Sequence, residues 1–400
     1  MLTEKLISFA GLMIFLLIAW ALSVNRRRIH FRLVIWGVAL QFIFALLILK
    51  TRPGLVVFDA ARVVMTKILD FTDYGATFLF GKLVSDYSIG AVVAFKVLPT
   101  IVFISALMGV LYYFRIIQAF VWVMAKIMQW TMKASGAEAL MAAMEIFMGI
   151  ESTTGMKDYI RKMTHSELFT VMTAFMASIA GSVMAAYVSF GASAGHLLAA
   201  SVMSAPAAIA ISKLMIPETE EPLTRGVVKM SLKSDDVNVI EAAANGAAVG
   251  LKLAATIGAM LLAFVALIGM IDFLLKDRFT LFKTIAQYIP ASIAFIMGVP
   301  WEDCIEVGRL LVIKVVFNEF ISYQKMQGLI ASGVLQPRSI TIATYALCSF
   351  ANLGSIAILI GGYGGIAPER KKEIASLGVR ALISGTLAGF MTATIAGILI

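Results

Sequence analysis

The chain has 400 residues, of which 60% are hydrophobic and only 14% are charged. An ordinary soluble domain has about 25% charged residues, so this chain lacks the polar surface that a soluble protein of its size needs. These proportions exclude a cytosolic enzyme, a nucleic-acid-binding protein and a disordered chain. The net charge of +9 does not indicate DNA binding, because Lys and Arg stand between apolar runs, where they set membrane topology. The sequence predicts an integral membrane protein that crosses the bilayer many times.

The cysteines and histidines form no recognisable catalytic or metal-binding pattern. Cys304 and Cys348 lie in apolar surroundings, and their placement fits neither a disulfide framework nor a metal-ligand spacing. His30, His165 and His196 are scattered and make no HExxH-like set. We therefore expect no resident cofactor, and we expect that the protein is not an enzyme.

Two apolar runs open the chain. Residues 6–24 carry no charge, and 19 residues suffice for a helix to cross a hydrocarbon core of about 30 Å. Four arginines follow at 26–32, after the apolar run, whereas a cleavable signal peptide carries its charge before it. The pattern predicts a retained first span with its N-terminus outside and the arginines in the cytoplasm. Residues 31–50 supply the return span.

The chain then alternates between charged and apolar stretches. Charged residues interrupt 55–86, so this stretch is predicted to lie at the membrane interface. Residues 89–114 are the third long apolar run. Two tryptophans and a lysine anchor 116–132, which predicts a helix lying along the membrane. Five further apolar runs follow at 168–190, 197–216, 240–275, 339–363 and 377–400.

Two segments are too short and too polar to span. Residues 137–165 are apolar for about ten residues and break at Gly149 into a polar stretch. Residues 303–316 are helical in pattern and lead to the polar tip Asn318-Glu319-Phe320, after which a second arm runs to 334. Each segment predicts a re-entrant hairpin, in which two half-helices meet at a polar tip inside the membrane.

The run after each hairpin repeats. Residues 166–191 align without a gap on 339–364, and Gly181-Ser182 falls on Gly354-Ser355. Each copy has a small polar break in mid-span. Two copies of a hairpin plus a broken helix are typical of transporters built from repeats, which bind substrate near the midplane. A channel or a structural bundle with chance similarity is the alternative.

The predicted fold is an all-α integral membrane protein. We expect about eight transmembrane helices and two re-entrant helical hairpins in an inverted-repeat-like arrangement, with interfacial amphipathic helices. The expected division is an N-terminal transmembrane pair with an interfacial segment (1–85), a gate-like repeat with the third span, first hairpin and first broken helix (90–193), and a C-terminal part with the second hairpin and second broken helix (194–400).

Polar side chains within the apolar segments are the candidates for chemistry. A carboxylate inside the bilayer costs at least ~2.5 kcal/mol, so it persists mainly when it binds something or is paired. The candidates are Glu145, Glu151, Asn318, Glu319 and Asn352. Carboxylates and amides suit a neutral ligand rich in hydroxyl groups.

Simpler roles compete with ligand binding. The serine hydroxyls at the breaks (Ser178, Ser182 and Ser355) suit Na⁺, but each could instead bond a carbonyl of its own helix. Glu145 could pair with Lys96 or Lys314.

Several stretches in order resemble the concentrative nucleoside transporter family. They are FLFGKLVSD (78–86), KVLPTIVFISALMGVLYY (96–113), KMTHSELFTVM (162–172), ASIAGSV (177–183), KLMIPETEEP (213–222), GVPWED (298–303), KVVFNEFISY (314–323), CSFANLGSIAILIGGYG (348–364) and GTLAGFMTATIAG (385–397). The resemblance covers nearly the whole chain, and its NEF and FANLxS motifs are specific. It implies a multi-pass protein of the cytoplasmic membrane and a homotrimer in the lipid bilayer. It also implies that each protomer has its own nucleoside site.

The resemblance assigns the ribose to residues of the second hairpin and second broken helix. The glutamate of the NEF tip is Glu319 here, and the asparagine and serine of the FANLxS motif are Asn352 and Ser355. All three types are present, which implies intact ribose recognition.

The resemblance assigns the nucleobase to the first hairpin and to residues near it. The resemblance places Gly149, Ile150, Glu151, Val183 and Phe350 beside the base. The family's tip reads GQTE or GQSE, whereas this chain reads GIES, so the glutamine is missing and Glu151 matches the motif's glutamate only with a gap. We therefore expect an altered base preference.

The coupling-ion site carries a second departure. The resemblance places the ion among Glu145, Met148, Ser178 and Ile179, with Glu145 where the family has an asparagine. A carboxylate could hold Na⁺ more strongly or take a proton in its place, so the coupling cation is Na⁺ or, alternatively, H⁺.

The function predicted is cation-coupled import of nucleosides by alternating access. The first alternative is a symporter for a nucleobase or a modified nucleoside, because the first tip has changed. A channel is disfavoured by the repeat with its two re-entrant tips. An intramembrane enzyme would need a nucleophile–base pair or a metal-binding acid cluster at a helix break, and the sequence has neither there.

Overall fold

Helices account for every regular element in the part of the chain that the structure describes. The computed structural model describes residues 2–85, 93–150, 152, 156–224, 236–274 and 280–400. Seven helices there are long and apolar enough to cross a membrane. The predicted span at 339–363 is not among them, because a five-residue break divides it into two short helices.

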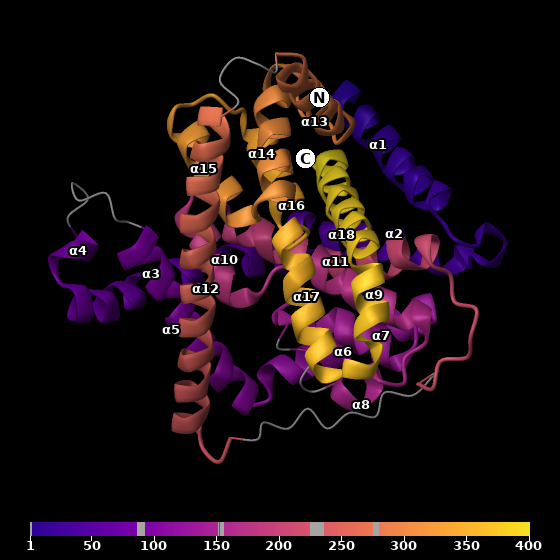
Figure 1. Ribbon diagram of the computed structural model, residues 1–400, viewed down its shortest axis with the longest axis horizontal. Coiled ribbons are helices and arrows are strands. Elements are labelled where there is room, and N and C mark those ends of the chain that lie inside the picture. Colours follow the sequence, from indigo (N-terminus) through magenta and orange to yellow (C-terminus); the bar gives the residue numbers. More distant parts are fainter. Residues whose placement is uncertain (1, 86–92, 151, 153–155, 225–235, 275–279) are drawn as a thin grey trace.

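The first part of the chain combines two spans with a long amphipathic helix. Thr51 caps that helix, since its hydroxyl oxygen accepts a hydrogen bond of 3.1 Å from the Gly54 amide. Figure 1 shows the amphipathic helix and the short one after it extending sideways from the body of the molecule. The elements are α1 (Leu2–Ala21), η1 (Arg26–Arg28), α2 (Phe31–Lys50), α3 (Arg52–Phe80) and α4 (Lys82–Ser85).

The first hairpin comes after a third span and a helix whose outer face carries exposed tryptophans. Its first arm starts with a capping box, in which Ser135 and Glu138 bond each other's backbone amides. Its tip includes the undescribed residues 151 and 153–155. The elements are η3 (Val93–Val97), α5 (Leu98–Tyr113), α6 (Ile116–Met132), α7 (Gly136–Met144) and α8 (Lys157–Ile160).

The first broken helix lies in the centre of the protein. The next helix is equally buried, and peripheral helices follow it. In the broken helix and in the span after it, 94% of the apolar window is buried by protein. The elements are α9 (His165–Ala177), α10 (Gly181–Ser189), α11 (Ala194–Met215), α12 (Val239–Leu274) and α13 (Thr280–Ile296).

The second hairpin and second broken helix complete the repeat. The hairpin turns at Phe317 and Asn318, which agrees with the predicted polar tip. The elements are η5 (Trp301–Asp303), α14 (Cys304–Val316), α15 (Glu319–Ala331), α16 (Pro337–Leu347), α17 (Leu353–Ile366), η6 (Pro368–Arg370) and α18 (Lys371–Leu399).

The two breaks meet inside the bundle. The Phe350 amide, in the second break, donates a hydrogen bond of 2.9 Å to the Ser178 carbonyl in the first. The Gly181 amide, at the start of α10, donates to the Phe147 carbonyl of the first hairpin at 2.8 Å. Backbone groups that the breaks release from helical bonding are thus satisfied by the opposite repeat and by the hairpin, as a membrane interior requires.

The helices α5 and α12 pack through small residues. A Cβ atom on Gly109 would lie 2.5 Å from the Ala242 carbonyl oxygen, and one on Gly246 would overlap the Ser105 carbonyl. Small residues let backbones approach closely in a bilayer, where dispersion contacts drive helix association. This pair flanks the central repeats, and α12 contributes one wall of the cavity described below.

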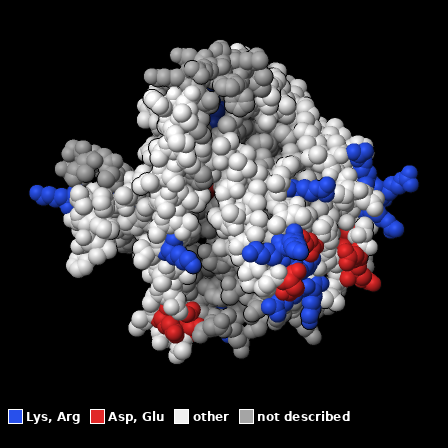
Figure 2. All heavy atoms as spheres, viewed as in Figure 1, with Lys and Arg blue, Asp and Glu red and all other residues white. Residues whose placement is uncertain are grey.

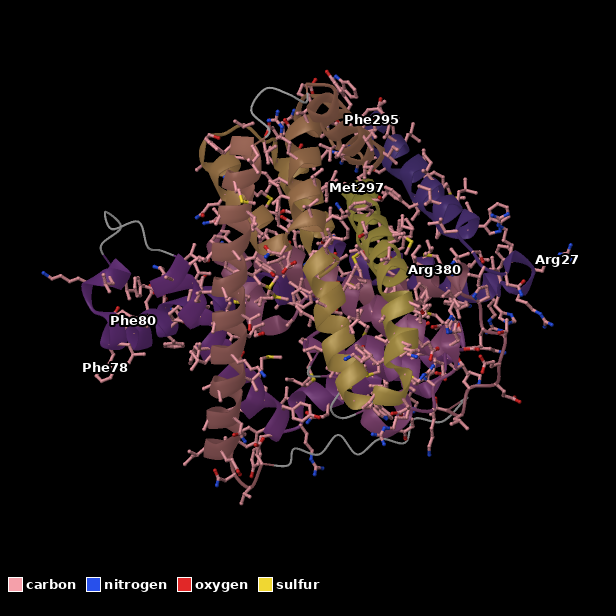
Figure 3. The ribbon with its side chains drawn as sticks, viewed as in Figure 1. Arg27, Phe78, Phe80, Phe295, Met297 and Arg380 are labelled. Carbon is pink, nitrogen blue, oxygen red and sulfur yellow. The ribbon has the colours of Figure 1, made fainter. Side chains whose placement is uncertain are left out.

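The surface is largely apolar. Figure 2 shows an uncharged expanse over most of one face, with basic side chains gathered on the side where the turn between α1 and α2 lies. Phe78 on α3 is 89% exposed and points away from the body (Figure 3). Such exposed apolar side chains are expected where lipid or another membrane protein covers the surface.

Candidate functional site

A cavity lies where the two hairpins, the two breaks and α12 meet. The cavity has a volume of about 90 Å³ and is partly open to solvent. Seven of the eight residues predicted to contact substrate line it; the eighth, Glu151, is outside the described residues. The seven are Gly149, Ile150, Val183, Glu319, Phe350, Asn352 and Ser355.

Among the described residues that line the cavity, Glu319 carries the charged side chain. It is 5% exposed and sits at the first position of α15, where the positive end of the helix dipole favours a negative charge. Its Oε1 accepts a hydrogen bond of 2.8 Å from the Tyr187 hydroxyl, and its Oε2 accepts one of 3.1 Å from Asn352 Nδ2. Two neutral donors therefore fix the direction of both oxygens while leaving the group accessible from the cavity.

Two asparagines lie at the starts of helices beside this carboxylate: Asn318 precedes α15 and Asn352 precedes α17. Asn318 Oδ1 accepts a hydrogen bond of 2.9 Å from the Ile321 amide, and Asn352 Oδ1 accepts one of 2.8 Å from the Ser355 amide. Each side chain is thus an N-cap in an extended backbone position. Because its oxygen is engaged, the Asn352 side chain turns its NH₂ group towards Glu319.

The remaining walls are mainly apolar. Phe350 lies at the second break and packs on Phe175 of α9, with ring centroids 5.7 Å apart. Val183 lies in the first turn of α10. Helix α12 adds Leu253, Thr256, Ile257 and Met260. A polar end and an apolar remainder suit a ligand with a hydroxylated part and a flat ring.

Ile150 has a second contact besides the cavity. A Cβ atom on Gly362 of α17 would overlap Cγ1 and Cδ1 of Ile150, so the tip of the first hairpin packs directly on that glycine. The apolar side chain therefore lies between the cavity and α17. Ile150 thus packs against α17 and also lines the cavity.

The residues predicted to hold the coupling ion lie around the first break. Glu145 caps the C-terminal end of α7 and is 1% exposed, and its Oε1 accepts a hydrogen bond of 2.5 Å from the Ser152 hydroxyl. The Ser178 hydroxyl donates to the Ala174 carbonyl at 2.9 Å, which is the local bond of a serine within a helix. Ile179 is fully buried in the break.

Met148 is the remaining predicted ion-site residue, and Lys96 and Lys314 are the lysines expected as alternative partners of Glu145. Met148 follows one turn after α7 and is partly buried. Lys96 pairs with Asp73 at 3.0 Å, and Lys314 bonds the second broken helix. The described residues contain no cluster of three or more His, Cys, Asp or Glu side chains that could hold a metal ion.

Sequence reasoning missed two features of the site. Tyr187, which orients Glu319, stands in an apolar run without any pattern around it; the general tendency of a buried tyrosine to bond a partner was the available signal. The cavity wall on α12 was also missed, because its side chains read as ordinary membrane-facing residues.

Family matches cover most of the chain. Residues 10–83 match the N-terminal part of the Na⁺-dependent nucleoside transporter family, and residues 196–397 match its C-terminal part. Residues 94–194 match the family named Gate and described as nucleoside recognition.

Curated relatives are similar over nearly the full chain. Solute carrier family 28 member 3 of Mus musculus is 44% identical over 422 aligned residues, which cover 99% of this chain and 59% of the relative. Sodium/nucleoside cotransporter 1 of Homo sapiens is 39% identical, with 99% of this chain and 64% of the relative covered. The chain therefore spans about three fifths of the length of these relatives.

Solved structures share the fold. CNTnw in an inward-facing substrate-bound state superposes with a TM-score of 0.92 at 38% identity, covering 100% of this chain and 98% of that one. A CNTnw variant in an outward-facing state gives a TM-score of 0.93 at 37% identity, covering 100% and 99%.

Proposed function

This chain belongs to the Na⁺-dependent, or concentrative, nucleoside transporter family of multi-pass membrane proteins, and from that premise we propose that it imports nucleosides by cation-coupled symport. The observation that carries the proposal is the buried Glu319 carboxylate, oriented by Tyr187 and Asn352 at the polar end of an apolar cavity. A hydroxylated sugar and a flat base match the two ends of that cavity.

In the proposed complex the ribose lies against Glu319, Asn352 and Ser355. The carboxylate accepts hydrogen bonds from ribose hydroxyls, and such charge-assisted bonds are about twice as strong as neutral ones. The base lies against the first tip (Gly149, Ile150 and Glu151) and against Val183 and Phe350. The aromatic ring of Phe350 supplies a flat apolar surface for a base.

The coupling cation is proposed to bind around the first break. Glu145 and Ser178 would supply side-chain oxygens, and Met148 and Ile179 would supply backbone carbonyls. Membership of a Na⁺-dependent family favours Na⁺. The carboxylate of Glu145 makes H⁺ the alternative, because it can take up a proton where an amide cannot.

Alternating access is proposed as the mechanism, since similar structures occur in inward-facing and outward-facing states. We propose that the protein works as a homotrimer in the cytoplasmic membrane. The proposed functional parts remain residues 1–85, 90–193 and 194–400, with one hairpin and one broken helix in each of the last two.

The deciding experiment is uptake of labelled uridine and adenosine into proteoliposomes, with Na⁺ and proton gradients imposed separately. We expect the Na⁺ gradient to drive uptake. We also expect the Glu145→Asn variant to retain this Na⁺ coupling. Uptake driven by a proton gradient alone, and lost in Glu145→Asn, would instead establish proton coupling through this carboxylate. Absence of nucleoside uptake under either gradient would contradict the proposed function.

A nucleobase or modified nucleoside is the second candidate substrate. The observation that favours it is Ile150, which presents an apolar side chain to the cavity where the family has a glutamine. Free uracil and adenine in the same uptake assay test it. Uptake of a base at the rate of its nucleoside would favour the second candidate.

A further inference from the structure

Lys314 is a buried cation that the proposed function does not use. It lies in the last turn of α14 and is 0% exposed. Its ammonium donates a hydrogen bond of 2.6 Å to the Ser349 hydroxyl and one of 3.3 Å to the Ala346 carbonyl, and it lies 5.8 Å from the centroid of the Phe390 ring. A charged side chain at membrane depth is costly unless it has partners or a function.

The partners of Lys314 are features of the second break. Ala346 belongs to the last turn of α16, whose final carbonyls have no intrahelical donor. Ser349 lies within the break after that helix. The ammonium thus lies between the C-terminal end of α14, to which it belongs, and that of α16. The C-terminal end of a helix carries a partial negative charge, so this position attracts a cation.

The first repeat has the corresponding arrangement without a lysine. Glu145 lies four residues before the tip residue Gly149, as Lys314 lies four residues before the tip residue Asn318. Both residues are at the C-terminal end of the first arm of a hairpin. The two breaks do not share the serine: in the alignment of 166–191 on 339–364, Ser178 falls on Ala351 and Ser349 falls on Met176, so the likeness lies in the hairpin position and the helix ends.

We propose that Lys314 is a tethered cation: its ammonium permanently supplies positive charge at the second break, whereas the coupling cation supplies it reversibly at the first. The inference rests on the proposed function, because it presupposes a cation at the first break. The oxygens that hold the ammonium, a carbonyl and a hydroxyl, are of the kind that would hold Na⁺. Lys314 therefore balances the partial negative charge of the helix end at the second break throughout transport. Only the first break responds to external cation.

A purely structural role is the competing explanation. Lys314 also interacts electrostatically with the Glu319 carboxylate, and a lysine kept for that purpose would have no relation to cation binding. The two explanations predict different effects of removing the ammonium. A tethered cation leaves behind a set of oxygens that a free cation can occupy, whereas a structural lysine leaves a defect that no added cation repairs.

The test compares Lys314→Gln with Lys325→Gln, which removes an exposed lysine from the second arm of the same hairpin. Thermal stability of the purified protein is measured in NaCl, LiCl and choline chloride at equal ionic strength. The Na⁺ dependence of uridine uptake is measured in proteoliposomes. For Lys314→Gln we expect lower stability in choline, recovery in Na⁺ or Li⁺, and a steeper Na⁺ dependence of uptake than for the parent protein and the control.

A variant of Lys314 that folds but gains no cation-dependent stabilisation would overturn the proposal. Lys314→Met, which keeps an unbranched apolar stem one atom shorter than that of lysine, is tested in parallel in case the glutamine is not tolerated. If neither can be recovered in any cation while Lys314→Arg folds, a free cation cannot replace the ammonium and the proposal also fails. If the parent protein shows no cation-coupled uptake at all, the proposed function has failed, which is a distinguishable result.

Discussion

Several weak local preferences together fix the position and orientation of the Glu319 carboxylate. Asn318 caps α15, the helix dipole favours the carboxylate at its first position, and Tyr187 and Asn352 bond its two oxygens. A buried charge needs this degree of compensation. The resulting acceptor is oriented before any ligand arrives, which reduces the entropic cost of binding.

Glu319→Gln is expected to weaken nucleoside binding strongly. Hydrogen bonds to a charged group contribute ~1.5–3 kcal/mol, which corresponds to a loss of about 10- to 150-fold in affinity. Calorimetric binding and uptake of uridine and adenosine measure the effect. Glu302→Gln, on the exposed turn before α14, is the control and should behave like the parent protein. Parent-like affinity of a folded Glu319→Gln protein would remove Glu319 from the ribose site.

Ile150→Gln tests whether the first tip reads the base. Glutamine can pair with donor and acceptor edges of a base, whereas isoleucine offers only an apolar surface, so we expect a changed order of affinities. Competition of a panel of purine and pyrimidine nucleosides against labelled uridine provides the measurement. If the order is unchanged and uptake is intact, base selection lies elsewhere and Ile150 only packs.

At the scale of elements, the characteristic feature of each repeat is a helix that is interrupted within the protein. Each break exposes helix ends, and the other repeat or the hairpin satisfies them, as the bond from the Phe350 amide to the Ser178 carbonyl shows. The arrangement needs close approach at particular glycines. Gly362 is the one that connects the first tip to α17, because its lack of a side chain makes room for Ile150.

Gly362→Ala is expected to displace the first tip and change nucleoside affinity. The added methyl group would overlap Ile150, while Gly361→Ala, one residue earlier in the same helix, meets no atom within 4 Å. Both changes raise helix propensity by about 1 kcal/mol, so the control isolates the steric effect. Affinity is measured by calorimetry for both proteins. A Gly362→Ala/Ile150→Ala protein should regain lost affinity; equal behaviour of the two single variants would show that the contact has no effect on the site.

At the scale of the whole molecule, the buried centre contrasts with an apolar periphery. The broken helix α9–α10 and the span α11 are almost wholly enclosed by protein, whereas in α12 only 12% of the apolar window is buried. Helix α12 nevertheless supplies part of the cavity. The cavity thus lies between the compact centre and a peripheral helix, and the proposed alternating access requires that these two sides move relative to each other.

The proposed homotrimer predicts an assembly of three times the 43.2 kDa mass of one chain. Exposed aromatic side chains on α3 such as Phe78 and Tyr74 leave apolar surface for a neighbouring chain or lipid to cover. Native mass spectrometry after release from lipid nanodiscs gives the number of chains. A monomeric mass for a preparation that catalyses uptake after reconstitution into proteoliposomes would contradict the trimer.

The sequence alone determined the membrane class, the two hairpin tips and the two breaks. These depend on local properties: the length of an apolar run, a polar interruption, and an asparagine that caps the helix after it. It also identified Glu319 and Asn352, because polar groups within apolar segments stand out against their neighbours.

Only the tertiary structure decided which separate segments share a site. It brought the Tyr187 hydroxyl to Glu319, 132 positions later in the chain, added the wall from α12 and placed Ile150 on Gly362. It also gave the extent of the predicted break within 339–363, which separates two helices by five residues. The sequence does not distinguish an apolar side chain that faces lipid from one that faces a cavity or another helix. The contacts of such residues depend on packing between elements, which no local pattern encodes.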